Sequence, residues 1–80
     1  MSIPKELQHL LSIDPETMGG AICFAGTRIP VSILLDNHRV GVSMDEFLDE
    51  YPDLTRPVIQ QVLDWEDRKA REALGLEQAS

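Results

Sequence analysis

The chain has 80 residues with 14 acidic and 7 basic side chains, a formal net charge of −7 that disfavours phosphate backbones and anionic lipid surfaces as partners. A domain of this size buries only about 60% of the surface of its unfolded chain, which leaves little room for a large ligand pocket. The lone cysteine, Cys23, excludes an internal disulfide, and no apolar run approaches the roughly 18 residues of a membrane span, so we expect a soluble cytoplasmic protein without a membrane segment.

Residues 1–25 are predicted to form an arm of two short strands. Apolar residues cluster in 10–13 and in 21–24, and the segment 14–20 between them contains a proline and two glycines, which are typical of turns. Because two strands alone are barely stable in water, this hairpin must pack on the rest of the domain or pair with another chain.

Two helices are predicted to follow the arm. Pro30 suits the first turn of a helix that ends near Gly41, and an apolar face recurs at helical spacing, formed by Val31, Leu34, Leu35 and His38. Ser43 and Glu46 have the spacing of a capping box, which predicts a second, short helix that Pro52 terminates.

Thr55 is predicted to cap a third and longest helix, which has Pro57 in its first turn and ends at Gly75. The apolar face of this helix consists of Val58, Ile59, Val62, Leu63 and Trp65, and its second half is expected to project from the core. The predicted fold class is mainly α, in a single domain over 1–80. A two-strand β-hairpin arm (1–25) precedes a helix-turn-helix-like three-helix bundle (26–75) and a frayed tail (76–80).

Several segments carry a family resemblance. The run from Gly19 to Val31, with its Gly26-Thr27-Arg28-Ile29-Pro30 turn, resembles domain-of-unknown-function family number 433, as do the later strings Gly41-Val42-Ser43 and Tyr51-Pro52-Asp53-Leu54-Thr55. The resemblance covers roughly residues 11–66. It implies a small helix-turn-helix-like domain whose strand arm can pair between protomers, and which often acts as antitoxin to a PIN-like ribonuclease toxin.

The leading hypothesis is therefore a homodimeric, antitoxin-like protein that masks a basic PIN-like toxin and contacts operator DNA as part of that complex. The sequence departs from the family pattern at Ala21 and Ile22, where a lysine and a proline are common. Asp64, Glu66 and Asp67 also make the end of the third helix more acidic than is typical of the family, which disfavours direct DNA contact.

A stand-alone helix-turn-helix transcriptional regulator is the alternative hypothesis. Base-reading side chains would then lie near the start of the third helix, because arginine pairs with guanine and glutamine with adenine in the major groove. The candidate DNA-binding residues are Arg28, Thr55, Arg56, Gln60 and Gln61. For Arg28, which could also bind a carboxylate, the competing interpretation is a structural bond to Asp36 or to the hairpin.

The broad apolar face of the third helix is the candidate partner-binding surface, because tryptophan often anchors interfaces and acidic neighbours attract a basic partner. The candidate partner-binding residues are Val58, Ile59, Leu63, Trp65, Glu66 and Asp67. Ordinary core packing is the competing interpretation of the apolar members of this set, and a purely structural dimer is a third hypothesis for the whole protein.

An enzyme is not expected, because the sequence contains no catalytic constellation, phosphate-binding loop or cofactor motif. His9 and His38 are far apart and neither belongs to a cluster with metal-ligand spacing, so we expect no metal site and no small-molecule cofactor. Cys23 lies in an apolar strand without a cationic neighbour, which favours a small buried hydrophobe over a reactive thiolate.

Overall fold

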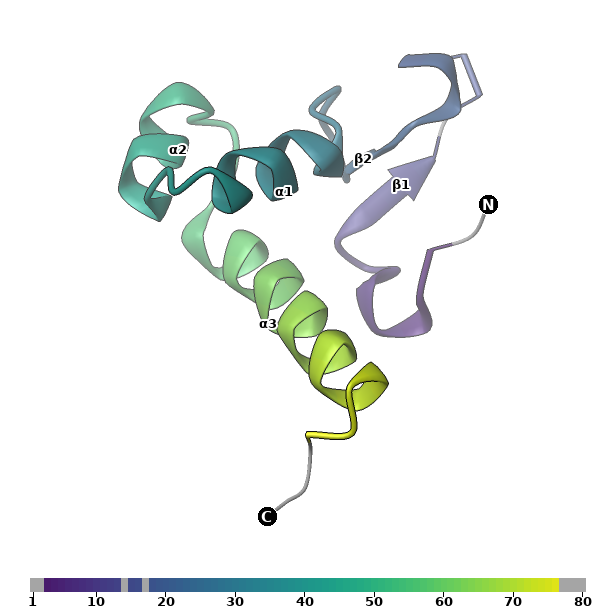
Figure 1. Ribbon diagram of the computed structural model, residues 1–80. Coiled ribbons are helices and arrows are strands. Elements are labelled where there is room, and N and C mark those ends of the chain that lie inside the picture. The colour runs from purple at the N-terminus through teal and green to yellow at the C-terminus, as the bar shows by residue number, and fades with distance from the viewer. Residues whose placement is uncertain (1–2, 14, 17, 77–80) are drawn as a thin grey trace.

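The structure is a computed structural model that describes residues 3–13, 15–16 and 18–76 (Figure 1). An N-terminal part contains a 3₁₀ helix η1 (Lys5–Leu7), strand β1 (Leu11–Ile13), a second 3₁₀ turn η2 (Met18–Gly20) and strand β2 (Ile22–Phe24). The α-helices α1 (Val31–Arg39), α2 (Met44–Glu50) and α3 (Arg56–Ala73) follow. The predicted fold class, mainly α with a two-strand hairpin arm, is confirmed.

Strand β2 is hydrogen-bonded on both of its edges. It pairs antiparallel with β1, with Leu11 opposite Phe24, and the Ala25 N–H extends the pairing by donating to the Leu10 carbonyl at 2.9 Å. On the other edge, the Phe24 N–H donates to the Ile29 carbonyl at 3.0 Å. The hairpin is therefore fastened to the chain segment that leads into α1. Part of the predicted 14–20 turn, Asp14 and Thr17, lies outside the described residues.

The turn between β2 and α1 is closed by the side chain of Thr27. Its hydroxyl donates to the Phe24 carbonyl at 2.9 Å and accepts from the Ile29 N–H at 3.0 Å. Gly26 has φ of +79°, a left-handed conformation that glycine adopts at little cost. One hydroxyl and one glycine thus set the direction in which the chain enters α1.

The helix ends follow local signals with two exceptions. Pro30 is extended, with φ of −67° and ψ of 142°, so α1 begins at Val31 and the proline is its N-cap instead of a first-turn residue. Thr55 does occupy the N-cap of α3, but its side chain makes no capping hydrogen bond, and this part of the prediction is wrong. At the other end of α3 the predicted stop is confirmed.

Gly75 ends α3 in a Schellman-type cap. Its φ is +73°, its N–H donates to the Glu72 carbonyl at 3.2 Å, and the Leu76 N–H donates to the Arg71 carbonyl at 2.8 Å. Leu76, which we expected to belong to a frayed tail, is therefore held by the cap. The rest of that predicted tail, 77–80, lies outside the described residues.

The capping box of α2 is present as predicted. The Glu46 N–H donates to Ser43 Oγ at 3.2 Å, and the Ser43 N–H donates to Glu46 Oε1 at 3.1 Å. Replacing Ser43 with alanine leaves the Glu46 N–H without this acceptor, so we expect the free energy of unfolding to fall by about 0.5–2 kcal/mol in urea titration. Ser32→Ala, at an exposed serine of α1, is the control, and an equal loss in both variants would contradict the assignment.

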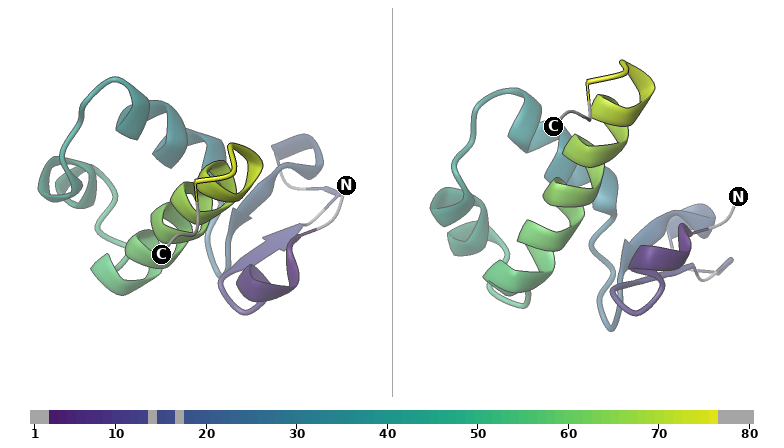
Figure 2. Two further views of the ribbon diagram at one scale, coloured as in Figure 1. Left: turned by 60° about the horizontal axis from the view of Figure 1, so that its bottom comes forward. Right: turned by 90° about the horizontal axis from the view of Figure 1, so that it is seen from below.

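One apolar core joins the arm to the helices. In both views of Figure 2, α3 lies between α2 on one side and the N-terminal arm on the other, and α1 adjoins the arm at β2. The buried members of the core come from all of these parts, and they are Leu7, Leu10, Leu11, Phe24, Leu34, Phe47, Leu54, Ile59 and Val62. Because burial of apolar area is the dominant favourable term, the arm is an integral part of the domain and not an appendage.

Candidate functional site

A turn of five residues, 51–55, connects α2 to α3. The Leu54 N–H donates to the Tyr51 carbonyl at 3.0 Å, and Leu54 is buried beneath the turn. The four candidate DNA-binding residues of α3 and its cap all lie on the exposed side of the helix start, and they are Thr55, Arg56, Gln60 and Gln61. The predicted grouping of these side chains is thus present.

Each long side chain of this group is already bonded within the protein. Arg56 forms an ion pair with Asp45, and its other terminal nitrogen lies 3.2 Å from the sulfur of Met44. Gln60 donates to Asp64 Oδ1 at 2.9 Å, and Gln61 donates to the Pro57 carbonyl at 3.2 Å. Base recognition would first have to break these contacts. Two of them place a carboxylate, that of Asp45 or Asp64, beside a side chain that would contact the bases.

Helix α2 presents a continuous acidic face next to this helix start. Its apolar residues, with Phe47 at the centre, turn toward the core. The opposite side of the helix is exposed and carries Asp45, Glu46, Asp49 and Glu50, which helical spacing places on one face. We call these four residues the acidic face. A DNA backbone would meet repulsion here, whereas a basic protein surface would be attracted.

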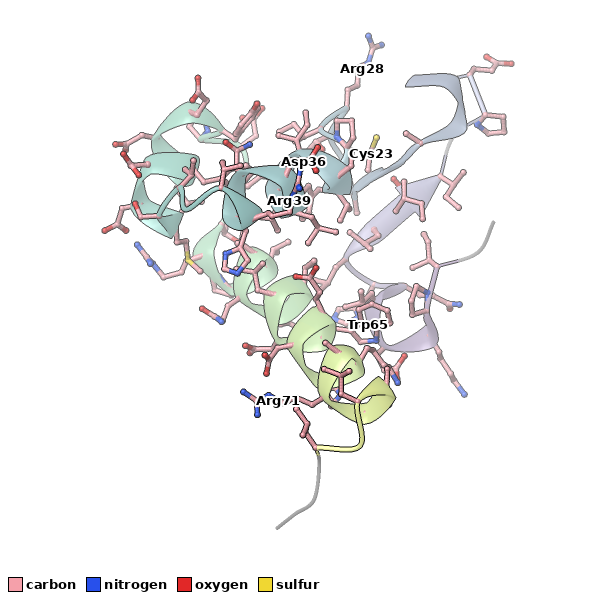
Figure 3. The ribbon with its side chains drawn as sticks, viewed as in Figure 1. Cys23, Arg28, Asp36, Arg39, Trp65 and Arg71 are labelled. Atoms are coloured by element: carbon pink, nitrogen blue, oxygen red, sulfur yellow. The ribbon has the colours of Figure 1, made fainter. Side chains whose placement is uncertain are left out.

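Arg28 lies apart from the acidic face. Figure 3 shows its side chain pointing away from α1, where Asp36 lies. Among the described residues Arg28 forms no ion pair, so the alternative of a structural bond to Asp36 is wrong. Arg28 instead borders an open hollow of about 670 Å³, together with Ser12, Cys23, Gly26, Thr27, Ile29 and Asp53. Cys23 is buried there, as its sequence context predicted.

The structure divides the predicted partner-binding surface among different environments. Ile59 is 0% exposed at the centre of the core, so its assignment to a binding surface is wrong for the folded protein. Val58 and Leu63 are half-buried against the same core. Glu66 and Asp67 are exposed, and Trp65 is half-buried beside η1 (Figure 3). The helix turns these side chains in different directions, and no single patch contains all of them.

Trp65 and Glu66 instead border a groove between the arm, α1 and α3. The groove has a volume of about 520 Å³ and is almost wholly apolar. Its lining comprises Pro4, Leu7, Leu11, Ala21, Ile22, Val31, Ser32, Leu35, Val62, Trp65 and Glu66. Sequence reasoning found only Trp65 and Glu66, because the others are brought together by tertiary packing. A local signal that it missed is Pro4, which precedes η1 and its buried Leu7.

The far side of Trp65 holds η1 against α3. Lys69 Nζ lies 3.8 Å from Glu6 Oε2 and 5.9 Å from the centre of the Trp65 ring. The pKa of the Glu6 carboxyl is lowered, first by a hydrogen bond from its own backbone and then by the Lys69 ammonium, against a partial opposing effect of desolvation. The folded state therefore favours ionised Glu6, and this contribution to stability is lost as pH falls through the lowered pKa.

The described residues contain neither a cluster of metal ligands nor a helix that could span a membrane. Within the described ranges, no three His, Cys, Asp or Glu side chains come together as a metal site would require. Across the same part of the chain, no helix combines the length and the apolar character needed to cross a membrane.

A known protein family matches this chain from the hairpin through the first part of α3. The family model described as "Protein of unknown function (DUF433)" matches residues 11–65. A crystal structure of a DUF433 member protein from Anabaena variabilis is similar, with a TM-score of 0.66 and 25% sequence identity, and the match covers 96% of this chain and 88% of that chain. No curated protein matches the chain.

Proposed function

The chain belongs to the DUF433 family of proteins of unknown function. From its resemblance to antitoxin-like members and from its acidic surface, we propose that it is an antitoxin-like protein that binds and neutralises a PIN-like ribonuclease toxin. The acidic face is the observation that carries this proposal. It lies beside the start of α3, the helix that a helix-turn-helix protein would turn toward DNA, because Asp45 pairs with Arg56, and it suits a basic protein instead.

Charge and bonding both favour a protein partner over DNA at this face. The net charge of −7 repels phosphates, and the one arginine at the start of α3 is neutralised by Asp45. A nuclease surface built to hold RNA is basic, so the acidic face can occupy it in place of the nucleic acid. Operator binding, in this proposal, belongs to the complex, and the stand-alone regulator is the less favoured function.

The test is a ribonuclease assay with a PIN-like nuclease, which this proposal expects to be encoded by the adjacent reading frame. Titrating the full-length protein into the assay should abolish RNA cleavage at an equimolar ratio. Unchanged cleavage at molar excess would overturn the proposal. Fluorescence anisotropy with duplex DNA should meanwhile show no binding by the protein alone at physiological salt. Tight binding that Arg56→Ala and Gln60→Ala remove would favour the regulator.

Charge reversal locates the docking surface. Asp49→Lys combined with Glu50→Lys should slow association with the nuclease by about tenfold in stopped-flow mixing, since surface charge acts mainly on the encounter rate. Both changes lie at the C-terminal end of α2, where lysine is favourable for the helix. Glu66→Lys combined with Asp67→Lys changes the net charge equally and is the matched control. A larger effect in the control would place the nuclease at the end of α3.

A further inference from the structure

The open hollow beside Arg28 lies on the outer face of the hairpin. Successive side chains of a strand point to opposite faces, and the cross-strand pair Leu11 and Phe24 belongs to the core. The next pair, Ser12 and Cys23, therefore faces outward, and both residues line the hollow. Its volume of about 670 Å³ lies within the range of about 300–1,000 Å³ that small-molecule sites have.

Two opposite charges border this hollow without pairing. Arg28 belongs to the turn before α1 and Asp53 to the turn between α2 and α3, and both side chains are exposed. Neither forms an ion pair with any described residue. The Arg28 guanidinium extends into solvent in Figure 3, and no described contact holds it there, so it is free to turn over the hollow. A cation and a carboxylate from different segments are thus available to one ligand.

Hydrogen bonds fix the backbone of both segments that carry these charges. In the first turn, the Thr27 hydroxyl joins the Phe24 carbonyl to the Ile29 N–H. In the second turn, the residue after the carboxylate is the buried Leu54, whose N–H donates to the Tyr51 carbonyl at 3.0 Å. Because these backbones are already ordered, a ligand in the hollow has only side chains to immobilise, which lowers the entropic cost of binding.

The turn before α1 also has hydrogen-bond donors that the fold leaves unused. The N–H groups of Gly26 and Arg28 have no acceptor among the described residues, and the Ser12 hydroxyl forms no hydrogen bond with them. A guanidinium with nearby backbone N–H groups suits a carboxylate, whereas Asp53 suits an ammonium. An anion alone would be repelled by Asp53, and a cation alone by Arg28. A ligand that carries both charges satisfies both sides of the hollow.

We propose that this hollow binds a free amino acid with an apolar side chain. Its carboxylate contacts Arg28 and the unused N–H groups of the turn, and its ammonium contacts Asp53. Its side chain lies over Cys23 and Ile29, which supply the apolar part of the lining. Such a zwitterion has no net charge, so the net charge of −7 on the protein does not repel it. The hollow is separate from the acidic face, and this activity goes beyond nuclease binding.

Nuclear magnetic resonance titration of the full-length protein with L-leucine is the first test. We expect the amide signals of Gly26 and Arg28 to shift with a dissociation constant of about 1 mM, a weak affinity because the hollow is open to solvent. N-acetyl-leucine lacks the ammonium and leucinamide lacks the carboxylate, so each should bind about tenfold more weakly. No shift with leucine, equal affinity for all three compounds, or tighter binding of inorganic phosphate would each overturn the proposal.

Two substitutions then assign the two charges of the ligand. Arg28→Gln should remove the preference for leucine over leucinamide, and Asp53→Asn should remove the preference for leucine over N-acetyl-leucine. Arg39→Gln and Asp49→Asn change the same charges at exposed residues outside the hollow, so these matched controls should keep both preferences. If both hollow variants kept their preferences, or if a control lost one, the ligand would lie elsewhere and the proposal would be wrong. These titrations contain no nuclease, so they and the inhibition assay fail independently.

Discussion

Replacing Phe24 with alanine is expected to lower the free energy of unfolding by about 3–5 kcal/mol. Phe24 is 1% exposed and lies in β2, where the hairpin, the Gly26–Pro30 turn and the helices meet in one core. Small domains have total stabilities of only about 5–15 kcal/mol, so this single truncation should leave a substantial fraction of the chain unfolded at 37 °C.

Urea unfolding followed by the fluorescence of Trp65, the only tryptophan, measures this effect. Phe24→Leu is the matched control, because it keeps most of the apolar volume and should cost less than about 1.5 kcal/mol. If Phe24→Ala and Phe24→Leu gave the same small loss, the arm would not share the core of the helices, and the described packing of β2 would be incorrect.

Replacing Thr27 with valine should cost about 1–3 kcal/mol, although the two side chains have nearly the same shape. Valine removes the hydroxyl that donates to the Phe24 carbonyl and accepts from the Ile29 N–H. The Phe24 carbonyl keeps the backbone N–H of residue 27, so the Ile29 N–H is the half-buried group that loses its partner. Differential scanning calorimetry would record the loss as a lower midpoint temperature.

Thr55→Val provides an internal comparison for this prediction. Thr55 is exposed, and its hydroxyl makes no capping bond to α3, so its replacement should change stability by no more than about 0.5 kcal/mol. A larger loss in Thr55→Val than in Thr27→Val would contradict this prediction.

The parts of the fold that could be predicted are those that local chemistry determines. Ser43 and Glu46 satisfy each other's backbone within one turn, and Gly75 needs only its own positive φ, so both helix ends follow from short strings. Thr55 shows the limit of this approach, because an N-cap residue can occupy its place without forming the bond. A side-chain rotamer depends on neighbours that a local pattern does not contain.

The candidate site was less predictable because it depends on packing between distant segments. Helical spacing correctly gathered apolar side chains on α3, but it could not tell that Ile59 faces the centre of the core while Trp65 faces η1. The groove combines residues near position 4 with residues near position 66, and no short pattern relates them. Asp45 and Arg56 likewise meet only because α2 and α3 pack at a particular angle.

The position of η1 against α3 has a consequence for the order in which the protein can fold during synthesis. Leu7 shares its core with Ile59 and Val62, and Glu6 pairs with Lys69, so a segment that is synthesised before the three α-helices packs on α3, which is synthesised after the other two. A two-strand arm has little stability of its own. The arm must therefore wait, unfolded, until α3 has emerged, and the domain is completed in a single late step.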